Sequence, residues 1–192
     1  MKITGAAVAG LVFGSLTSLA NVVSSPYGPA GARVVGSAVA KAGPVVSLLL
    51  DAGWSWAALA VAVGWAARTR GPGALGGALA PAAATVSYHV ADASLWDAGT
   101  DMVVWLVVGV PVGLVLGLIG ALVRRPGLTG LLAALFVPVG AAVQMVVISP
   151  GSGLIDAGPA TVAADIVWAG AALSATWALG RFWRRRRAPG TV

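Results

Sequence analysis

The chain carries few charges for its length of 192 residues, and this excludes an ordinary water-soluble domain. Apolar residues make up 58% of the chain and charged residues only 9%, whereas a soluble domain carries roughly 25% charged residues. A membrane-spanning helix needs about 20 apolar residues, so the length allows about six spans with short loops. We therefore predict an all-α fold: one polytopic membrane helix bundle over residues 1–192, with about six transmembrane helices.

The formal net charge of +6 does not indicate nucleic-acid binding, because the basic residues lie at the ends of apolar segments. The longest basic run, residues 184–187, directly follows the last apolar segment. Membrane proteins use basic residues in this way to set their orientation. The sequence contains no cysteine, which excludes disulfides, thiolate catalysis and cysteine-ligated metals.

The first apolar segment, residues 4–23, is expected to be a retained span. Ser18-Leu19-Ala20 near its end also fits a cleaved secretory signal, but the segment is long for a signal core. The outer-side connection, residues 24–53, begins with a turn-rich stretch. Its mildly apolar remainder predicts a short interfacial or re-entrant helix, either a plain surface helix or a lid over a cavity.

The next expected span, residues 55–67, is short unless it begins near Val45, which would place Asp51 inside the bilayer. Four further apolar segments follow, at residues 73–90, 102–123, 128–148 and 160–182. Pro81, Pro111 and Pro138 interrupt three of these, which a bundle tolerates because neighbouring helices satisfy the freed backbone groups. Small residues at four-residue spacing predict close helix packing: Gly109, Gly113 and Gly117.

Orientation follows from an alternation of loops with and without basic residues. The connections after the third and fifth segments contain no Lys or Arg, while the other connections do. By the positive-inside rule both ends lie in the cytoplasm. The excess of Arg over Lys, with abundant Ala, Gly and Val, suggests a high-GC bacterial genome, so we expect a multi-pass protein of the bacterial plasma (inner) membrane. The supporting residues are Lys2, Arg68, Arg70, Arg124, Arg125 and the 184–187 run, whereas Arg33 and Lys41 oppose the assignment.

Every acidic residue is an aspartate, and in this topology all of them lie at or near the outer boundary. Asp165 falls about one turn inside the last segment, and Asp51 falls near the start of the second. A carboxylate near hydrocarbon is costly unless it is paired, neutral or facing a polar cavity, so it marks a candidate functional site. Asp92 and Asp165 are the stronger candidates. The full set is Asp51, Asp92, Asp97, Asp101, Asp156 and Asp165.

Aromatic residues accompany these acids at spacings of three and four, which place side chains on one helix face. We expect these rows to converge on an outer-side pocket. The alternative is an interfacial aromatic belt with Asp101 as a helix N-cap. The pairs are Tyr88 with Asp92, Asp92 with Trp96, Asp101 with Trp105, Asp51 with Trp54, Asp165 with Trp168, and His89 with Asp92.

His89 is the only histidine. At three-residue spacing it is an expected acid/base partner of Asp92, or else an interfacial histidine at a helix end. No metal-ligand spacing is present, so no metal and no cofactor are expected. Nucleotide-binding loops and nucleophile elbows are absent as well.

The stretch from Trp54-Ser55-Trp56 through Arg68–Arg70 to Tyr88-His89-x-x-Asp92 resembles a family of small actinobacterial integral membrane proteins. In size and in its acid-plus-aromatic content the chain also resembles bacterial integral-membrane terpene cyclases. That likeness implies protonation of a prenyl chain to start cyclisation.

Three functional hypotheses remain open. The first is a metal-independent, proton-initiated cyclase of prenyl or terpenoid substrates, since an acid in a low-dielectric cavity and π faces for cations supply its chemistry. The second is a small-molecule-binding or transport component whose pocket takes a lipophilic or cationic molecule. The third is a structural partner subunit, which needs no cavity. The expected partners are membrane lipid and a lipophilic small molecule, and the oligomeric state is not determined by the sequence.

Overall fold

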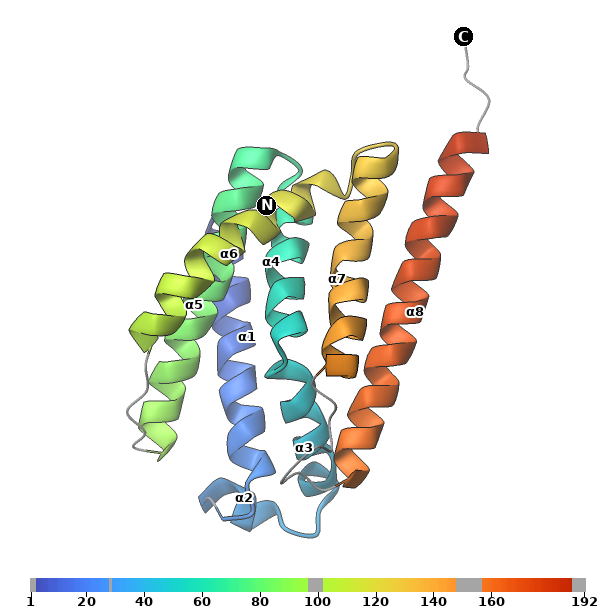
Figure 1. The fold of residues 1–192 in the computed structure, drawn as a ribbon. Coiled ribbons are helices and arrows are strands. Elements are labelled where there is room, and N and C mark those ends of the chain that lie inside the picture. The colour runs from blue at the N-terminus through green and yellow to red at the C-terminus, as the bar shows by residue number, and fades with distance from the viewer. Residues whose placement is uncertain (1–2, 28, 97–101, 148–156, 188–192) are drawn as a thin grey trace.

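The computed structural model describes residues 3–27, 29–96, 102–147 and 157–187. Within these ranges the chain forms helices and no strand (Figure 1), which confirms the all-α prediction. In chain order the helices are α1 (Ile3–Ser24), α2 (Pro29–Val34), α3 (Ala38–Leu50), α4 (Gly53–Ala67), α5 (Arg70–Trp96), α6 (Met102–Leu122), α7 (Leu128–Val147) and α8 (Ala157–Arg187).

The long helices run up and down between two ends of a bundle (Figure 1). One end holds the turns before α5 and before α7 and the last turn of α8, and we call it the arginine end after Arg68, Arg124, Arg125 and residues 184–187. The opposite half holds α2, α3 and the last turns of α1 and α5, and we call it the acidic end after Asp51 and Asp92. Most arginines therefore lie at the end of the bundle opposite Asp51 and Asp92, while Arg33 of α2 and Lys41 of α3, which opposed the sequence pattern, lie in the same half as these acids.

Helix α5 occupies the middle of the bundle, where it packs against α1, α4 and α6. Glycine allows the backbones to meet. A Cβ placed on Gly117 of α6 would clash with the backbone of Gly73 and Gly77 of α5, and one on Gly10 of α1 would clash with the Ala80 carbonyl. The packing interpretation of the glycine row is confirmed for Gly113 and Gly117. A Cβ on Gly109, in contrast, would have nothing within 4 Å.

Among the described residues, four helices are long and apolar enough to cross a membrane. A bent pair, α3 with α4, brings the number to five if it forms one span. These numbers fall short of the six spans expected from the sequence, because α5 is rich in Gly and Ala and is not among the candidates. The candidates are α1, α6, α7 and residues Gly158–Arg186 of α8.

The long first connection contains α2 and α3, where a single short helix was expected. Ser37 caps α3, since its side chain accepts a hydrogen bond from the Ala40 N–H at 3.2 Å. Helices α3 and α4 meet at an angle of 64° with Asp51 at the break. No side chain of its own segment caps α4, so Gln144 of α7 does this instead, accepting from the Trp54 N–H at 3.0 Å.

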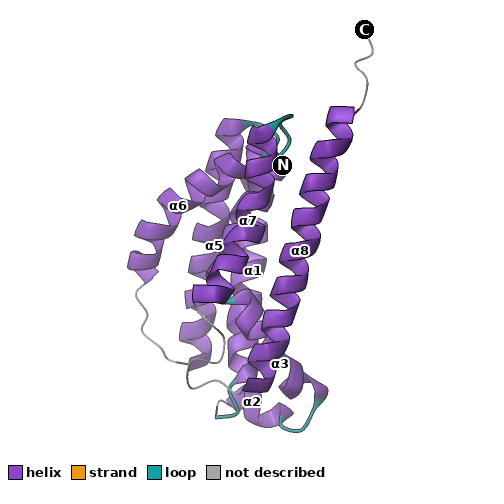
Figure 2. Ribbon diagram, turned by 45° about the vertical axis from the view of Figure 1, so that its right-hand side comes forward, coloured by secondary structure: helices purple, strands orange, loops and turns teal. Residues whose placement is uncertain are grey.

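Two helices are only partly packed. The C-terminal half of α6 lies against α4 and α5 through Gly113, Gly117 and Gly120, whereas its N-terminal half stands away from the bundle (Figure 2). Helix α8 packs on α7 and α3 and leaves much of its remaining surface exposed.

Candidate functional site

A cavity of about 390 Å³ lies where the N-terminal half of α6 diverges from α4 and α5. Its wall on the α6 side is apolar, and on the opposite side it meets the polar residues of α5 and the break between α3 and α4. The lining residues of the polar part are Asp51, Thr85, Tyr88 and His89, and those of the apolar and aromatic part include Trp56, Pro81, Trp105, Val108, Val112 and Leu116. This is the pocket at the acidic end.

Asn21 of α1 connects the polar residues behind this pocket. Its side-chain amide donates to the Tyr88 hydroxyl at 3.1 Å and, more weakly, to Asp51 Oδ2 at 3.5 Å. Its side-chain carbonyl accepts from the Ser47 hydroxyl. The Asn21 amide therefore links α1 to α5 and to the end of α3, and these hydrogen bonds hold Tyr88 and Asp51 in place beside the cavity.

Asp92 lies next to this network without lining the cavity. Its Oδ1 accepts a hydrogen bond from Ser18 Oγ at 3.3 Å, and Ser18 is fully buried on α1. The expected pairing of His89 with Asp92 is wrong for the described structure, because His89 Nδ1 bonds to the Thr85 carbonyl at 2.7 Å instead. Asp92 bonds instead to Ser18 on the neighbouring α1, and His89 bonds to Thr85 one turn earlier on α5.

His89 is the most buried titratable side chain of the pocket, with 8% of its surface exposed. A carbonyl oxygen only accepts hydrogen bonds, so the bond to Thr85 requires the proton on Nδ1. In the neutral ring Nε2 is then a lone-pair acceptor. Within the described part of the chain Nε2 has no hydrogen-bond partner, and His89 lines the cavity.

Aromatic rings form a continuous edge-to-face series beside the cavity. Trp56 meets Phe13 at 5.4 Å and Tyr88 at 6.3 Å between ring centroids, and Tyr88 meets His89 at 5.3 Å. Such contacts fix ring orientation. Trp105 closes the α6 side, although 62% of its surface is exposed.

The structure brings together only part of the residues proposed from the sequence. Asp51, Tyr88, His89 and Trp105 line one cavity. Asp165 and Trp168 do not line it, because α8 packs on α7 and α3 and the cavity is formed by α4, α5, α6 and the break after α3. Both are exposed on α8, so their expected convergence with the others is not found. Trp54 packs behind the break with a buried indole Nε1 that has no partner. Asp97, Asp101 and Asp156 and the Trp96 side chain lie outside the described residues.

Sequence reasoning missed the polar residues of α1 and α3 that hold the pocket together. Asn21 and Ser18 are three residues apart on a mostly apolar helix, and polar residues inside a span are a functional signal in the same way as carboxylates. Ser47 and Gln144 carried no comparable signal, since isolated Ser and Gln are common in helices. Among the described residues, no group of three His or Asp side chains is placed to hold a metal ion.

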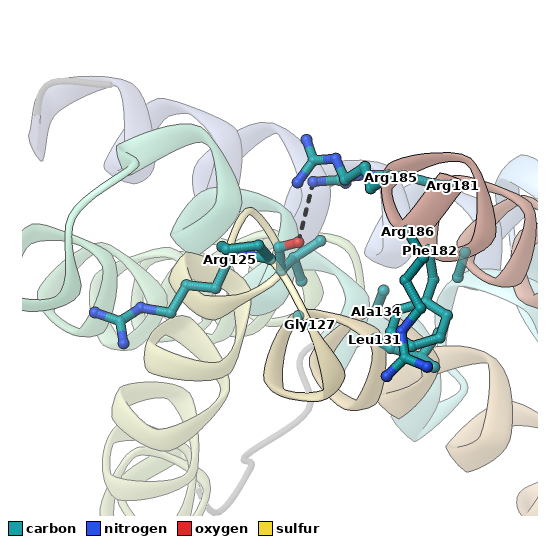
Figure 3. Close-up of a pocket in the computed structure, with 12 residues that line it drawn as sticks. Arg125, Gly127, Leu131, Ala134, Arg181, Phe182, Arg185 and Arg186 are labelled. Atoms are coloured by element: carbon teal, nitrogen blue, oxygen red, sulfur yellow. Dashed lines mark hydrogen bonds between the residues drawn. The ribbon is translucent and has the colours of Figure 1, made fainter. Parts of the chain in front are cut away.

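A second, smaller cavity of about 100 Å³ lies at the arginine end, between the start of α7 and the end of α8. Its arginine side chains point in different directions: Arg125 extends away from Arg181 and Arg185, while Arg186 lies against Phe182 (Figure 3). Arg181 donates to the Val123 carbonyl at 3.3 Å, close to the end of α6. These contacts anchor helix ends and do not converge on one ligand.

Comparisons with protein-family models, with curated proteins and with solved structures find no match to this chain, so the candidate site rests on its own geometry.

Proposed function

We propose that the chain is a multi-pass membrane protein whose pocket at the acidic end holds a lipophilic small molecule with a polar head. The supporting observation is the cavity of about 390 Å³ with one apolar and one polar side. Small-molecule pockets are largely apolar with a few placed polar groups, and their volumes begin at roughly 300 Å³. A purely structural subunit has no need of such a cavity.

The position of the cavity fits entry from the membrane. Val108 and Val112 line it and have exposed fractions of 53% and 50% on α6. An apolar molecule in the lipid can therefore reach the cavity along α6 without crossing the polar network. The same openness favours reversible binding over chemistry that requires a sealed, dry chamber.

The proposal includes six spans with both ends in the cytoplasm of a bacterial plasma membrane. Helix α5 is the sixth span, although its composition is only mildly apolar, because α1, α4 and α6 surround it and leave little of it facing lipid. Reporter fusions after Arg70, Arg125 and Val192 are expected to report cytoplasm. Fusions near Asp97 and Gly153 are expected to report the outer side, and finding Gly153 and Val192 on the same side would refute the arrangement.

Filling the cavity tests the binding function directly. In nanodiscs of zwitterionic lipid, 12-bromododecanol is expected to quench Trp56 and Trp105 fluorescence with a saturable component above linear lipid partitioning. Gly109 lines the cavity and has free space around it, so Gly109→Leu fills the cavity without a clash. This variant should lose the saturable component.

The matched control is Gly140→Leu on α7, because Gly140 also has nothing within 4 Å and lines neither cavity. It should bind like the unmodified protein. If quenching in the unmodified protein shows no saturable component, or if Gly109→Leu leaves it unchanged, the pocket is not a binding site.

A cyclase is the second candidate, favoured by the meeting of Asp51 with Tyr88, Trp56 and Trp105 at one cavity. In this reaction the protonated Asp51 carboxyl transfers its proton to a terminal alkene carbon, the resulting carbocation is attacked by a second double bond, and a ring proton returns to the carboxylate. Aromatic faces stabilise the intermediate cation. Asp51 replaces Asp92 and Asp165 as the proton donor, since neither of these lines the cavity.

The cyclase hypothesis is tested by product mass. Linear prenylated aromatic or cyclic-dipeptide substrates would be incubated with purified protein without added metal, and cyclised isomers of unchanged mass sought. Asp51→Asn should stop turnover while Asp165→Asn retains it. If no isomer forms with any such substrate while bromododecanol still binds saturably, the binding function stands alone.

A further inference from the structure

The polar side of the pocket contains two groups that only accept hydrogen bonds, beside hydroxyl groups that both donate and accept. The amide N–H groups of Asn21 are directed to Tyr88 and Asp51. The Nδ1–H group of His89 is bound to the Thr85 carbonyl. The groups at the cavity that only accept are therefore His89 Nε2 and the Asp51 carboxylate, while the Tyr88 and Thr85 hydroxyl groups both donate and accept.

His89 Nε2 is the most informative of these. The side chain is 92% buried, with 8% of its surface exposed, and Nε2 has no partner among the described residues. A ligand donor that reaches Nε2 would form a hydrogen bond that the described part of the protein does not itself supply.

Asp51 adds a negative charge at the mouth of the cavity. It is exposed, and within the described part of the chain no Lys or Arg forms an ion pair with it or with Asp92. Arg33 and Lys41, on the nearby α2 and α3, are exposed and form no ion pair with these acids either. When Asp51 is ionised, the polar side of the pocket therefore carries a negative charge that no Lys or Arg of the described residues pairs with.

The aromatic lining also favours a positively charged ligand. Trp56, Tyr88 and Trp105 all line the cavity, and the faces of Trp and Tyr attract cations within about 6 Å of the ring centroid. An anionic head would meet Asp51 and the negative faces of these rings. A neutral alcohol would satisfy only one of the available acceptors.

We propose that the ligand head is a protonated primary or secondary amine carried on a hydrocarbon tail. The ammonium N–H groups donate to the Asp51 carboxylate and His89 Nε2, and the tail lies along α6 beside Val108, Val112 and Leu116. This inference rests on the proposed binding function and specifies the ligand class that the pocket selects.

The test measures displacement of saturably bound 12-bromododecanol by matched twelve-carbon compounds in nanodiscs of zwitterionic lipid. Dodecylamine is expected to act at a concentration at least about tenfold lower than dodecanol, since a hydrogen bond to a charged group contributes about 1.5–3 kcal/mol. Dodecyltrimethylammonium, which has no N–H, should fall between the two, and dodecanoate should be weaker than dodecanol.

Two variants assign the preference to its residues. Asp51→Asn should make dodecylamine and dodecanol equally potent while dodecanol binding persists, which shows that the pocket is intact. His89→Phe keeps an aromatic ring, removes Nε2, and should weaken dodecylamine more than dodecyltrimethylammonium. Asp165→Asn is the matched control, because Asp165 is exposed and does not line the cavity.

Failures of the two proposals are distinguishable. If no saturable bromododecanol binding exists, the binding function falls, and the amine inference falls with it. If the alcohol binds but dodecylamine gains nothing, or Asp51→Asn leaves its gain unchanged, only the amine inference is overturned. Equal potency of the amine and the quaternary ammonium compound overturns the role of the N–H donors.

Discussion

The two ends of the bundle use their polar residues differently. At the arginine end, guanidinium groups bind main-chain carbonyls where helices finish: Arg124 donates to the Trp65 carbonyl at 3.0 Å and Arg181 to the Val123 carbonyl at 3.3 Å. At the acidic end, side chains from different helices bind one another, as Ser18 does with Asp92 and Asn21 with Tyr88.

The arginines at one end therefore anchor helix ends, whereas the polar residues at the other end lie around the proposed ligand pocket. The last carbonyls of a helix have no partner within the helix. Arg124 and Arg181 donate hydrogen bonds to such carbonyls at the ends of α4 and α6, so these guanidinium groups already have partners within the protein. Arginines at this end also lie over aromatic rings: Arg124 is 4.4 Å from the Trp65 ring centroid, and Arg186 is 4.5 Å from the Phe182 ring centroid. The acidic end instead leaves acceptors facing a cavity nearly four times larger, at about 390 Å³ against about 100 Å³.

The largest effect is expected where α6 packs against α5, between the two ends of the bundle. Gly117→Leu would force a side chain into the backbone of α5 at Gly73 and Gly77, and such overpacking against main chain should cost about 3 kcal/mol or more. We expect thermal unfolding, followed by circular dichroism in detergent, at a much lower temperature or no folded protein at all. Gly140→Leu is the control, and equal stability of the two variants would contradict the described packing.

A smaller loss is expected from the central amide of the acidic end. Asn21→Ala removes the bonds to Tyr88, Asp51 and Ser47, at roughly 1 kcal/mol each, so the free energy of unfolding should fall by about 2–3 kcal/mol and alcohol binding should weaken. Ser15→Ala is the matched control on an exposed position of α1. Unchanged stability in Asn21→Ala would show that the network contributes nothing.

An arginine substitution sharpens the contrast between the ends. Arg181→Gln removes the bond to the Val123 carbonyl and the contact with the Trp177 ring at 5.4 Å, and should cost about 1 kcal/mol of stability. Ligand binding should not change. Arg184→Gln, at an exposed position, should alter neither quantity, and a loss of ligand binding in Arg181→Gln would contradict the division of roles.

The smallest effect is expected at the end of α4, where Arg68 has a positive φ of 67°. A non-glycine residue in this left-handed conformation costs about 1–2 kcal/mol, and the extra backbone entropy that glycine loses on folding offsets about half of that. Arg68→Gly should therefore raise the free energy of unfolding by about 0.5–1 kcal/mol. Arg70→Gly is the comparison, because Arg70 begins α5 without a positive φ and should not stabilise the protein.

Helix positions could be predicted closely from the sequence because apolar runs and their boundaries are local properties. The segments expected at 102–123 and 128–148 correspond to Met102–Leu122 and Leu128–Val147. The inward or outward direction of a helix face could not be predicted in the same way. Asp165 and Asp92 have similar neighbours in the sequence, yet one is exposed on α8 and the other bonds to Ser18.

The same limit applies to the pocket. Spacing grouped Tyr88 and His89 with Asp92, but the acid that lines the cavity beside them is Asp51, which the break between α3 and α4 brings beside α5. Its supporting partner, Asn21, is 30 residues away along the chain. Contacts of this kind depend on how helices pack, and the periodicity of one segment carries no information about them.

The uneven packing of α6 has a mechanical consequence. Its C-terminal half is clamped between α4 and α5 at Gly117 and Gly120, whereas its N-terminal half, beyond Pro111, forms the outer wall of the cavity. Helix α6 is therefore held by close packing on one side of Pro111 and lacks such packing on the other. Because a proline interrupts helical hydrogen bonding, we expect α6 to bend at Pro111 when a bulkier ligand enters the cavity.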